Sequence, residues 1–419
     1  MQKGQLFNTK PHNIRSNFIP KLEKALTISL VHFYPLSGQL VTKRYDDDDH
    51  VRSFQVDCNK GPGARLIHAF VDLFVSDIVS SAEVKPIIAS FFDLGEKSIN
   101  HDGHTRPLLS VQVTELLDGV FIGFTMNHCI ADGTSFWHFI STLSEILTQL
   151  KSDDINEDKF DEISISQKPI YNTMFPSDRP CKITKVPYLD PDEFVRWYDL
   201  GPLKVRIFHF SSESISILKT KANQECGPHN NISSFQALCG LTWRSVTRAR
   251  HLRPELEVSF ALPINARTRI NPPLPSEYFR YFLTTTQCIS KAGDLLSNGP
   301  GHAALLINQT IKIHDDKVTR KMLHEFEEHP FIFRPGTDTV QNNSNRLFIG
   351  GSSKFDVYGL EFGLGKALTV RGGFVNMEDG RLIANPGREG RGSVDLEVYL
   401  KPGTMNTLEL DQEFMSYTL

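Results

Sequence analysis

The sequence predicts an α/β protein of two domains, and three observations support this prediction. The chain has 419 residues, a length that suits two domains of ordinary size. In its first half, alternating apolar residues typical of strands are followed at once by apolar residues at helical spacing. From about residue 151 to about residue 204, an acidic and proline-rich stretch lacks any periodicity. We therefore expect a first domain over residues 1–178, a crossover over 179–204 and a second domain over 205–419.

Composition and charge argue against several classes of partner. The formal net charge of -4 offers no basic field for a nucleic-acid backbone. No stretch approaches the ~20 consecutive apolar residues that cross a bilayer, and the first ten residues hold no apolar signal core. The 6 cysteines are dispersed without a CxxC pair, as is typical of a reducing compartment. We expect a cytoplasmic protein without nucleic-acid or membrane partners, and no feature requires more than a monomer.

The first predicted element is a helix over about residues 18–30, because apolar residues recur there at helical spacing before the chain breaks at Tyr34-Pro35. The run Asp46 to Asp49 follows a strand-like segment. Contiguous carboxylates repel one another and cannot converge as spaced metal ligands do, so we interpret this run as a solvated loop.

A β-hairpin is the next predicted element. Two alternating apolar runs, Leu108–Leu117 and Val120–Phe124, flank the dipeptide Asp118-Gly119. Asp-Gly between such runs is a strong hairpin signal. The second strand of this hairpin therefore delivers His128 at its carboxyl end.

A helix is predicted from Thr134 to Leu150, where apolar residues keep helical spacing for four turns. Strand, tight turn and helix thus surround the sequence His128 to Gly133. One interpretation is purely structural, with Asp132 or Thr134 capping the helix and His128 bonded to backbone. The other is catalytic, because an imidazole at a strand end can act as a general base. The pattern HxxxDG alone does not decide between them.

In the second half a helix is predicted to start at Ser233, because Ser233 to Gln236 forms a capping box ahead of an apolar helical run. Free N–H groups at a helix start can also bind a phosphate, so a ligand role for Ser233 and Ser234 stays open. A strand is predicted over Val258–Leu262, and Arg267 shortly after it is a candidate partner for a buried carboxylate.

Three short strands are predicted near the end of the chain, over Phe355–Gly359, Leu368–Val370 and Val394–Leu400. The sequence Gly363-Leu364-Gly365-Lys366 between the first two resembles a phosphate loop. It lacks the required earlier glycine and the following hydroxyl residue, so we reject this interpretation.

Neither a thiol nucleophile nor a metal fits the sequence around His128. Cys129 is adjacent on an extended chain, so its side chain points to the opposite face from the imidazole. A catalytic zinc site generally needs three protein ligands, and no HExxH or similar set supplies the third. We therefore expect no metal and no tightly bound cofactor.

The chain resembles the plant BAHD acyl-CoA-dependent acyltransferases. The residues that carry the resemblance are the HxxxDG motif, several shorter motifs in the same order, and a variant of the family's DFGWG motif; they are His128–Gly133 with Thr134–Trp137, Tyr34–Gly38, Ser233–Phe235 with Trp243–Arg244, Arg267–Pro275, Ala292–Leu296 and Glu361–Gly365. The resemblance covers nearly the whole chain.

This resemblance implies two chloramphenicol-acetyltransferase-like α/β domains, each a mixed sheet with flanking helices, joined by a long crossover loop. The segment from about 363 to 387 would complete the sheet of the first domain. A channel between the domains would admit acyl-CoA, the co-substrate, from one face and a small-molecule acceptor from the other. His128, midway, would deprotonate the acceptor, which attacks the thioester directly. Asp132 would point away and pair with Arg267.

The resemblance also implies roles for other residues. Ser233, Ser234, Gly363 and Gly365 would contact CoA. Leu364 and Arg280 would line the substrate channel, and Glu361 would join Arg267 in structural support.

Three departures from the family pattern bear on the site. EFGLG replaces DFGWG, which removes an indole ring at Leu364, and Tyr278-Phe279-Arg280-Tyr281 stands where many members have YFGN. Members of the family normally carry several tens of residues, including a strand and an active-site loop, before the segment that matches Gln2–Phe7. We expect these departures to change the shape of the channel.

The expected function is transfer of an acyl group from acyl-CoA to a hydroxyl or amine of a plant specialised metabolite. Two alternatives remain open at this point. The same scaffold could run a CoA-independent lyase or rearrangement reaction, in view of Leu364 and the altered segment around Arg280. It could also be a small-molecule binding protein without catalysis.

Overall fold

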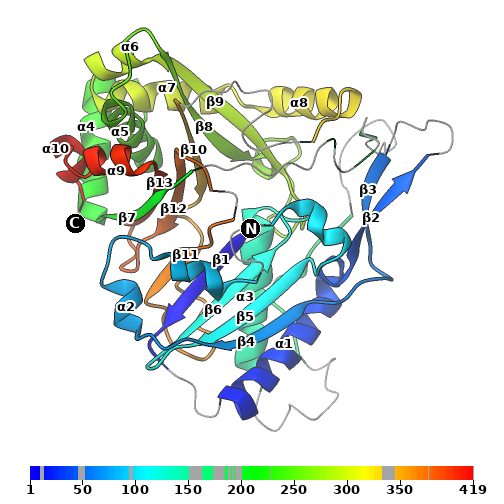
Figure 1. Cartoon of the computed structure of the whole chain (residues 1–419). Helices are drawn as coiled ribbons and strands as arrows, with labels where there is room; N and C mark the ends of the chain where they lie inside the picture. The colour runs from blue at the N-terminus through cyan, green and yellow to red at the C-terminus, as the bar shows by residue number, and fades with distance from the viewer. Residues whose placement is uncertain are drawn as a thin grey trace.

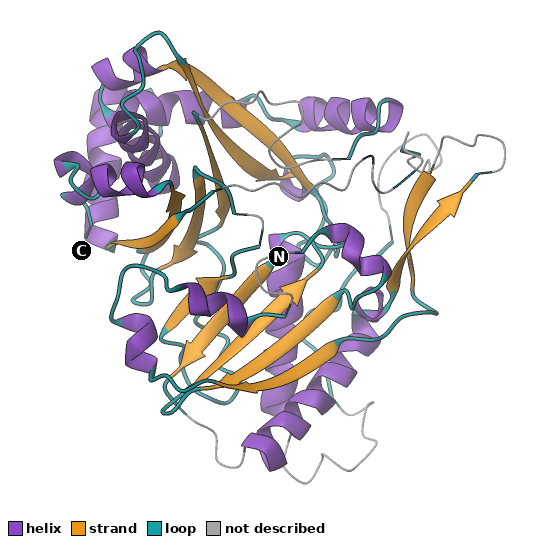
Figure 2. Cartoon of the chain, in the orientation of Figure 1, coloured by secondary structure: helices purple, strands orange, loops and turns teal. Residues whose placement is uncertain are grey.

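The computed structural model describes residues 1–9, 14–45, 52–93, 98–150, 163–172, 185–186, 190, 193, 201–227, 229–332, 345–375 and 377–418. The acidic run Asp46–Asp49 and most of the crossover lie outside the described residues. Two large sheets with helices packed on them, and a separate two-stranded sheet, make up the described chain, as Figures 1 and 2 show. This confirms the predicted α/β fold.

The first sheet has five strands in the order β11-β1-β6-β5-β4. β4 and β5 are parallel, and the other neighbouring pairs are antiparallel. The bounds are β1 (Gln2–Phe7), β4 (Arg65–Phe70), β5 (Leu109–Glu115), β6 (Val120–Met126) and β11 (Thr369–Gly372). Although β11 lies in the last quarter of the sequence, its residues Thr369 to Gly372 pair with residues 3–6 of β1.

Two long helices, α1 (Ile19–His32) and α3 (Gly133–Gln149), pack on the first sheet and on each other. Both present apolar residues at helical spacing, so each buries one stripe against the strands. The hairpin and both helices confirm the sequence-based predictions. Shorter elements complete this part of the chain; they are η1 (Ile14–Phe18), η2 (Tyr34–Ser37), β2 (Gln39–Arg44), β3 (Arg52–Asp57), α2 (Val75–Val79), η3 (Pro86–Phe91) and η4 (Asn100–His104).

The second sheet has six strands in the order β7-β13-β12-β10-β8-β9. Helices pack on it to form the largest apolar core, which surrounds the fully buried Trp243. The strands are β7 (Lys204–Phe210), β8 (Glu257–Asn265), β9 (Leu283–Lys291), β10 (Arg346–Gly351), β12 (Arg381–Pro386) and β13 (Val394–Leu400). The helices are α4 (Ser212–Cys226), α5 (Ser234–Ala249), η8 (Ala266–Thr268), α6 (Ala292–Ser297), α7 (Pro300–Lys312), α8 (Asp316–Glu328), α9 (Pro402–Leu408) and α10 (Gln412–Met415).

A separate apolar cluster joins the two sheets. It packs Leu6 and Phe121 of the first sheet against Ile383 and Tyr399 of the second, all of them buried. Burial of such side chains stabilises the contact by about 25 cal/mol per Å² of apolar surface. The two sheets therefore hold a defined position relative to each other.

The predicted strand over Phe355–Gly359 is wrong, because this segment is a turn. The Asp356 carboxylate accepts a hydrogen bond of 3.0 Å from the Gly359 N–H, which folds the chain back on itself. The apolar side chains Val357 and Tyr358 that suggested a strand are nevertheless buried in the core of the first sheet. Local side-chain bonding of aspartate thus outweighed the alternating pattern.

Candidate active site

His128 lies in the loop between β6 and α3, where this loop comes close to η4. The Asn100 side-chain oxygen accepts a hydrogen bond of 3.0 Å from the His128 backbone N–H. The side-chain amide nitrogen of Asn127 donates to the backbone carbonyl of Asn100 at 2.8 Å, so two adjacent residues of the loop are bound to the same asparagine. The backbone that carries the imidazole is therefore held from outside its own loop.

A backbone carbonyl selects the tautomer of the imidazole. His128 Nδ1 lies 2.9 Å from the carbonyl oxygen of Ala131. A carbonyl oxygen only accepts hydrogen bonds, so Nδ1 must carry the proton. Nε2 of the neutral ring is then left with a lone pair, as a proton acceptor needs.

The surroundings of His128 keep its ring uncharged. The side chain is partly accessible to solvent but is surrounded by protein atoms. Burial is the main cause that lowers the pKa of His128, to about 4. The Ala131 hydrogen bond opposes the shift only in part. At neutral pH the imidazole is therefore a free base and not a cation.

The pKa of the Cys129 thiol is shifted in the opposite direction from that of His128. Although it reaches the surface in part, surrounding protein raises the pKa of its thiol to about 12. A thiol of this pKa holds almost no thiolate at neutral pH, and the thiolate is the nucleophile. This supports the sequence-based argument against Cys129 as a nucleophile.

The Asp132 carboxylate has three partners in the described chain: the backbone N–H groups of Ser135 and Phe282 and the guanidinium of Arg267. Its Oδ1 accepts the Ser135 N–H at 3.0 Å and so caps α3. Its Oδ2 lies 2.5 Å from Nη1 of Arg267, an ion pair in which the two side chains are 0% and 1% exposed. The sequence separates these two residues by 135 positions. The pair therefore joins the loop that carries His128 to the second sheet.

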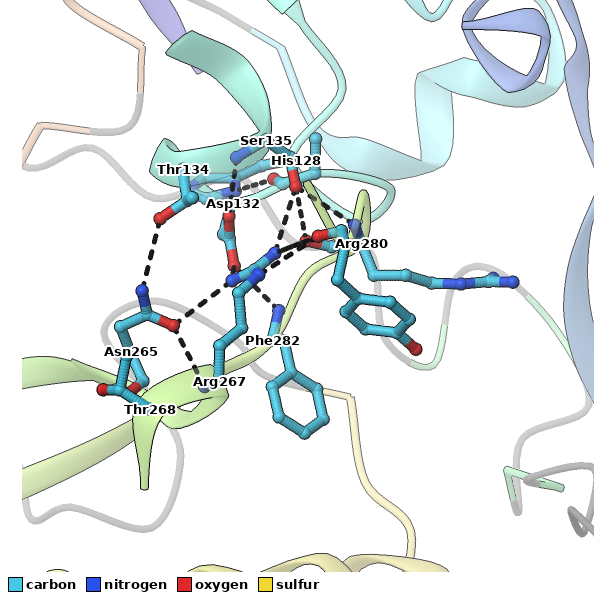
Figure 3. Close-up of polar contacts among 11 residues, drawn as sticks. His128, Asp132, Thr134, Ser135, Asn265, Arg267, Thr268, Arg280 and Phe282 are labelled. Carbon is cyan, nitrogen blue, oxygen red and sulfur yellow. Dashed lines mark hydrogen bonds and ion pairs between the residues drawn. The ribbon is translucent and has the colours of Figure 1, made fainter. Parts of the chain in front are cut away.

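Arg267 extends this contact into a network (Figure 3). Its guanidinium donates to the Ser135 hydroxyl at 3.1 Å, to the Tyr278 carbonyl at 2.9 and 3.1 Å, and to the Arg280 carbonyl at 2.8 Å. A buried charge needs such partners, since an uncompensated one is strongly destabilising. The network binds three segments to one another: the His128 loop, η8 and residues 278–282.

The segment 278–282 brings an aromatic side chain to His128 that the sequence analysis did not single out as a site residue. The Tyr281 ring lies 5.5 Å from the imidazole, centroid to centroid, at an angle of 63°. The signal that could have identified it is the departure from YFGN, which places a large ring where many family members have an amide.

Ser233 and Ser234 lie at the start of α5, away from the Asp132–Arg267 network. Ser233 is the N-cap. Its hydroxyl accepts a hydrogen bond of 3.2 Å from the Gln236 backbone N–H, and its own backbone N–H donates one of 2.8 Å to the Gln236 side-chain oxygen. The predicted capping box is confirmed. The Ser233 side chain is exposed, and Ser234 is the first residue of the helix.

Gly363 and Gly365 lie in the exposed turn that replaces DFGWG. Both have positive φ, of 72° and 79°, where residues other than glycine are strained. A Cβ at either position would meet no described atom within 4 Å. The backbone conformation of the turn thus requires these glycines, whatever they contact.

The remaining predicted residues have different environments. Leu364 is 6% exposed and packs into the core of the first sheet. Glu361 is exposed, and its carbonyl accepts the Leu364 N–H at 2.7 Å. Arg280 is exposed, and its guanidinium donates to the Tyr171 carbonyl at 3.2 Å.

The described residues contain neither a metal-binding cluster nor a membrane-spanning helix. No group of three or more His, Cys, Asp or Glu side chains among them is placed to hold a metal ion. None of the helices in the described ranges combines the length and the apolar character that crossing a membrane requires.

Residues 1–415 match the family model described as Transferase family. An uncharacterised acetyltransferase of Arabidopsis thaliana is 32% identical over 99% of this chain and 90% of its own. A BAHD acyltransferase of the same plant, DCR, is 30% identical over 98% of this chain and 83% of its own.

Two solved structures have the same fold. Vinorine synthase has a TM-score of 0.72 and 19% identity, covering 100% of this chain and 90% of the other. TRI101 of F. graminearum, complexed with coenzyme A and deoxynivalenol, has a TM-score of 0.73 and 15% identity, covering 100% and 95%. At these identities the likeness concerns the fold.

The fold is that of the two-domain, chloramphenicol-acetyltransferase-like acyltransferases. Two large sheets with helices packed on them agree with the solved structures of vinorine synthase and TRI101. Because the family model spans nearly the whole chain and a 32% identical relative covers it, the chain belongs to the Transferase family, the BAHD acyltransferases.

Proposed function

We propose that this protein transfers an acyl group from an acyl-CoA to a hydroxyl or amine of a small plant metabolite, with His128 as general base. The observation that most directly supports this proposal is the hydrogen bond from His128 Nδ1 to the Ala131 carbonyl, which leaves Nε2 as a proton acceptor. Membership of an acyltransferase family and the coenzyme A complex of the structural neighbour TRI101 support the choice of acyl-CoA as co-substrate.

The proposed reaction proceeds by direct attack. Nε2 of His128 takes the proton of the acceptor, whose oxygen or nitrogen bonds to the thioester carbonyl carbon. The resulting tetrahedral oxyanion collapses, the carbon–sulfur bond breaks, and the imidazolium returns the proton to the CoA thiolate. The lowered pKa of His128 keeps the ring uncharged before attack, and it makes the imidazolium that forms a ready proton donor to the thiolate.

Within this proposal the other residues have supporting roles. Asp132 and Arg267 hold the loop and do not touch the reacting atoms. The start of α5 at Ser233 and Ser234 and the turn at Gly363 and Gly365 are proposed contacts for CoA. N–H groups at a helix start bind phosphate oxygens well, which supports the first of these two contacts.

His128→Ala tests the proposal, with the exposed His229→Ala as a matched control in the second domain. Loss of the general base should lower kcat by about 10²- to 10⁴-fold, whereas the control should keep wild-type activity. Transfer from a panel of acyl-CoAs to a panel of alcohols and amines is measured by mass spectrometry. Full activity of His128→Ala would refute the proposal. Product formed without acyl-CoA would favour the lyase alternative, and calorimetry without acyl-CoA binding would favour the non-catalytic one.

A further inference from the structure

Tyr281 borders the accessible space beside the general base. Its ring is in edge contact with the His128 imidazole, at a centroid distance of 5.5 Å, within the range of favourable aromatic pairs. The residue is 47% exposed, although its neighbour Phe279 is 2% exposed. Since His128 is itself partly accessible, a molecule that reaches the imidazole from solvent passes next to this ring.

The backbone on both sides of Tyr281 is fixed by the buried network. The Arg280 N–H donates to the Ser135 hydroxyl at 3.0 Å, and the Arg280 carbonyl accepts from that hydroxyl at 2.9 Å. On the other side, the Phe282 N–H donates to Asp132 Oδ2 at 2.9 Å, as Figure 3 shows. Asp132 and Ser135 belong to the His128 loop and α3. One buried network therefore sets the position of the phenol relative to the imidazole before any substrate binds.

The hydroxyl of Tyr281 is available to a ligand. Within the described ranges, no protein group forms a hydrogen bond with it. Burial, and secondarily the Asp132 carboxylate, raises the pKa of Tyr281. The hydroxyl therefore stays protonated at neutral pH and can donate a hydrogen bond.

We propose that Tyr281 is a specificity-determining residue that contacts the acceptor, with its ring against a flat unsaturated group and its hydroxyl donating to an oxygen on that group. The inference rests on the proposed function, in which the acceptor gives its proton to His128. That acceptor atom must come within hydrogen-bond reach of Nε2, so the atoms bonded to it lie beside the adjacent phenol ring. The favoured acceptors are therefore aromatic or conjugated alcohols and amines that carry a further oxygen.

The test uses two acceptors of similar size, 4-methoxybenzyl alcohol and (4-methoxycyclohexyl)methanol, which differ in flatness. Ligand-observed NMR measures their binding to the wild type, Tyr281→Ala and Tyr281→Phe without acyl-CoA. The wild type should bind the aromatic alcohol about tenfold more tightly, and Tyr281→Ala should lose this preference. Tyr281→Phe keeps the ring and should weaken aromatic binding about fivefold, as expected for one lost hydrogen bond.

Tyr417→Phe is the matched control, because it removes a phenol hydroxyl from the C-terminal segment that packs on the second core. It should bind both alcohols as the wild type does. An aromatic preference that is unchanged in Tyr281→Ala would overturn the inference. So would acyl-transfer kinetics in which the Tyr281 substitutions alter KM for acyl-CoA but not KM for the acceptor. If binding follows the prediction while the wild type transfers no acyl group, the proposed reaction fails, and Tyr281 stands as a contact for flat ligands beside His128 but not for an acyl acceptor.

Discussion

Replacing Arg267 with methionine should destabilise the protein by about 3 to 5 kcal/mol, the usual cost of an uncompensated buried charge. The substitution keeps most of the side-chain volume but removes the guanidinium that lies 2.5 Å from Asp132. Two donors to that carboxylate remain, the N–H groups of Ser135 and Phe282. These two donors partly compensate the charge, so they favour the lower end of the predicted loss of stability. The loss of the bonds to the carbonyls of Tyr278 and Arg280 acts in the other direction.

Urea unfolding of the wild type, Arg267→Met, Asp132→Asn and the double variant measures this effect. Because the two residues interact directly, the double variant should be more stable than the sum of the single changes predicts, by about 1 to 3 kcal/mol. Arg253→Met is the control: Arg253 also lies in an ion pair, at 3.5 Å from Glu255, but the two side chains are 74% and 63% exposed. Its removal should cost less than about 1 kcal/mol.

Equal effects of Arg267→Met and Arg253→Met would refute this reasoning, since burial is the main difference between the two pairs. Additive effects in the double variant would refute it in another way. They would show that Asp132 and Arg267 contribute independently, although their atoms are in contact.

Two further predictions concern pH and packing. Because the pKa of His128 is lowered to about 4 and the proposed reaction uses its base form, kcat/KM should stay level from about pH 8 down to about pH 5. It should fall only as pH drops through that lowered pKa; a fall centred near the ordinary histidine pKa would contradict this. Leu364→Trp should cost about 1 to 3 kcal/mol, because Leu364 is buried in the first core. A thermal unfolding temperature at or above that of the wild type would show instead that the position has room for an indole.

Much of the local structure around the site could be predicted from the sequence. The hairpin β5–β6 and helix α3 follow from alternating and helical spacing and from Asp118-Gly119, all of them properties of neighbouring residues. The same patterns placed His128 at a strand end. The partnership of Asp132 with Arg267 was not readable from any pattern; it came from the family resemblance, and the structure contains the ion pair.

Other features of the site could not be predicted because they depend on long-range contacts. Tyr281 contacts His128 across the boundary between the two halves of the chain. No periodicity in either segment indicates this contact. The turn at Asp356 shows the reverse case, in which an alternating apolar pattern was real but its side chains were buried without a strand.

The sequence by itself determined the types of the elements around the site, the position of the histidine between strand and helix, and the family. The family resemblance had assigned residues 363–387 to the first sheet, but only the tertiary structure decided that residues 369–372 pair with β1. It alone decided that one buried network joins the His128 loop to the segment around Tyr281. The physical reason is the range of the interactions. Backbone conformation and capping are set by residues a few positions apart, whereas the β1–β11 pairing and the Asp132–Arg267 ion pair join residues more than 100 positions apart.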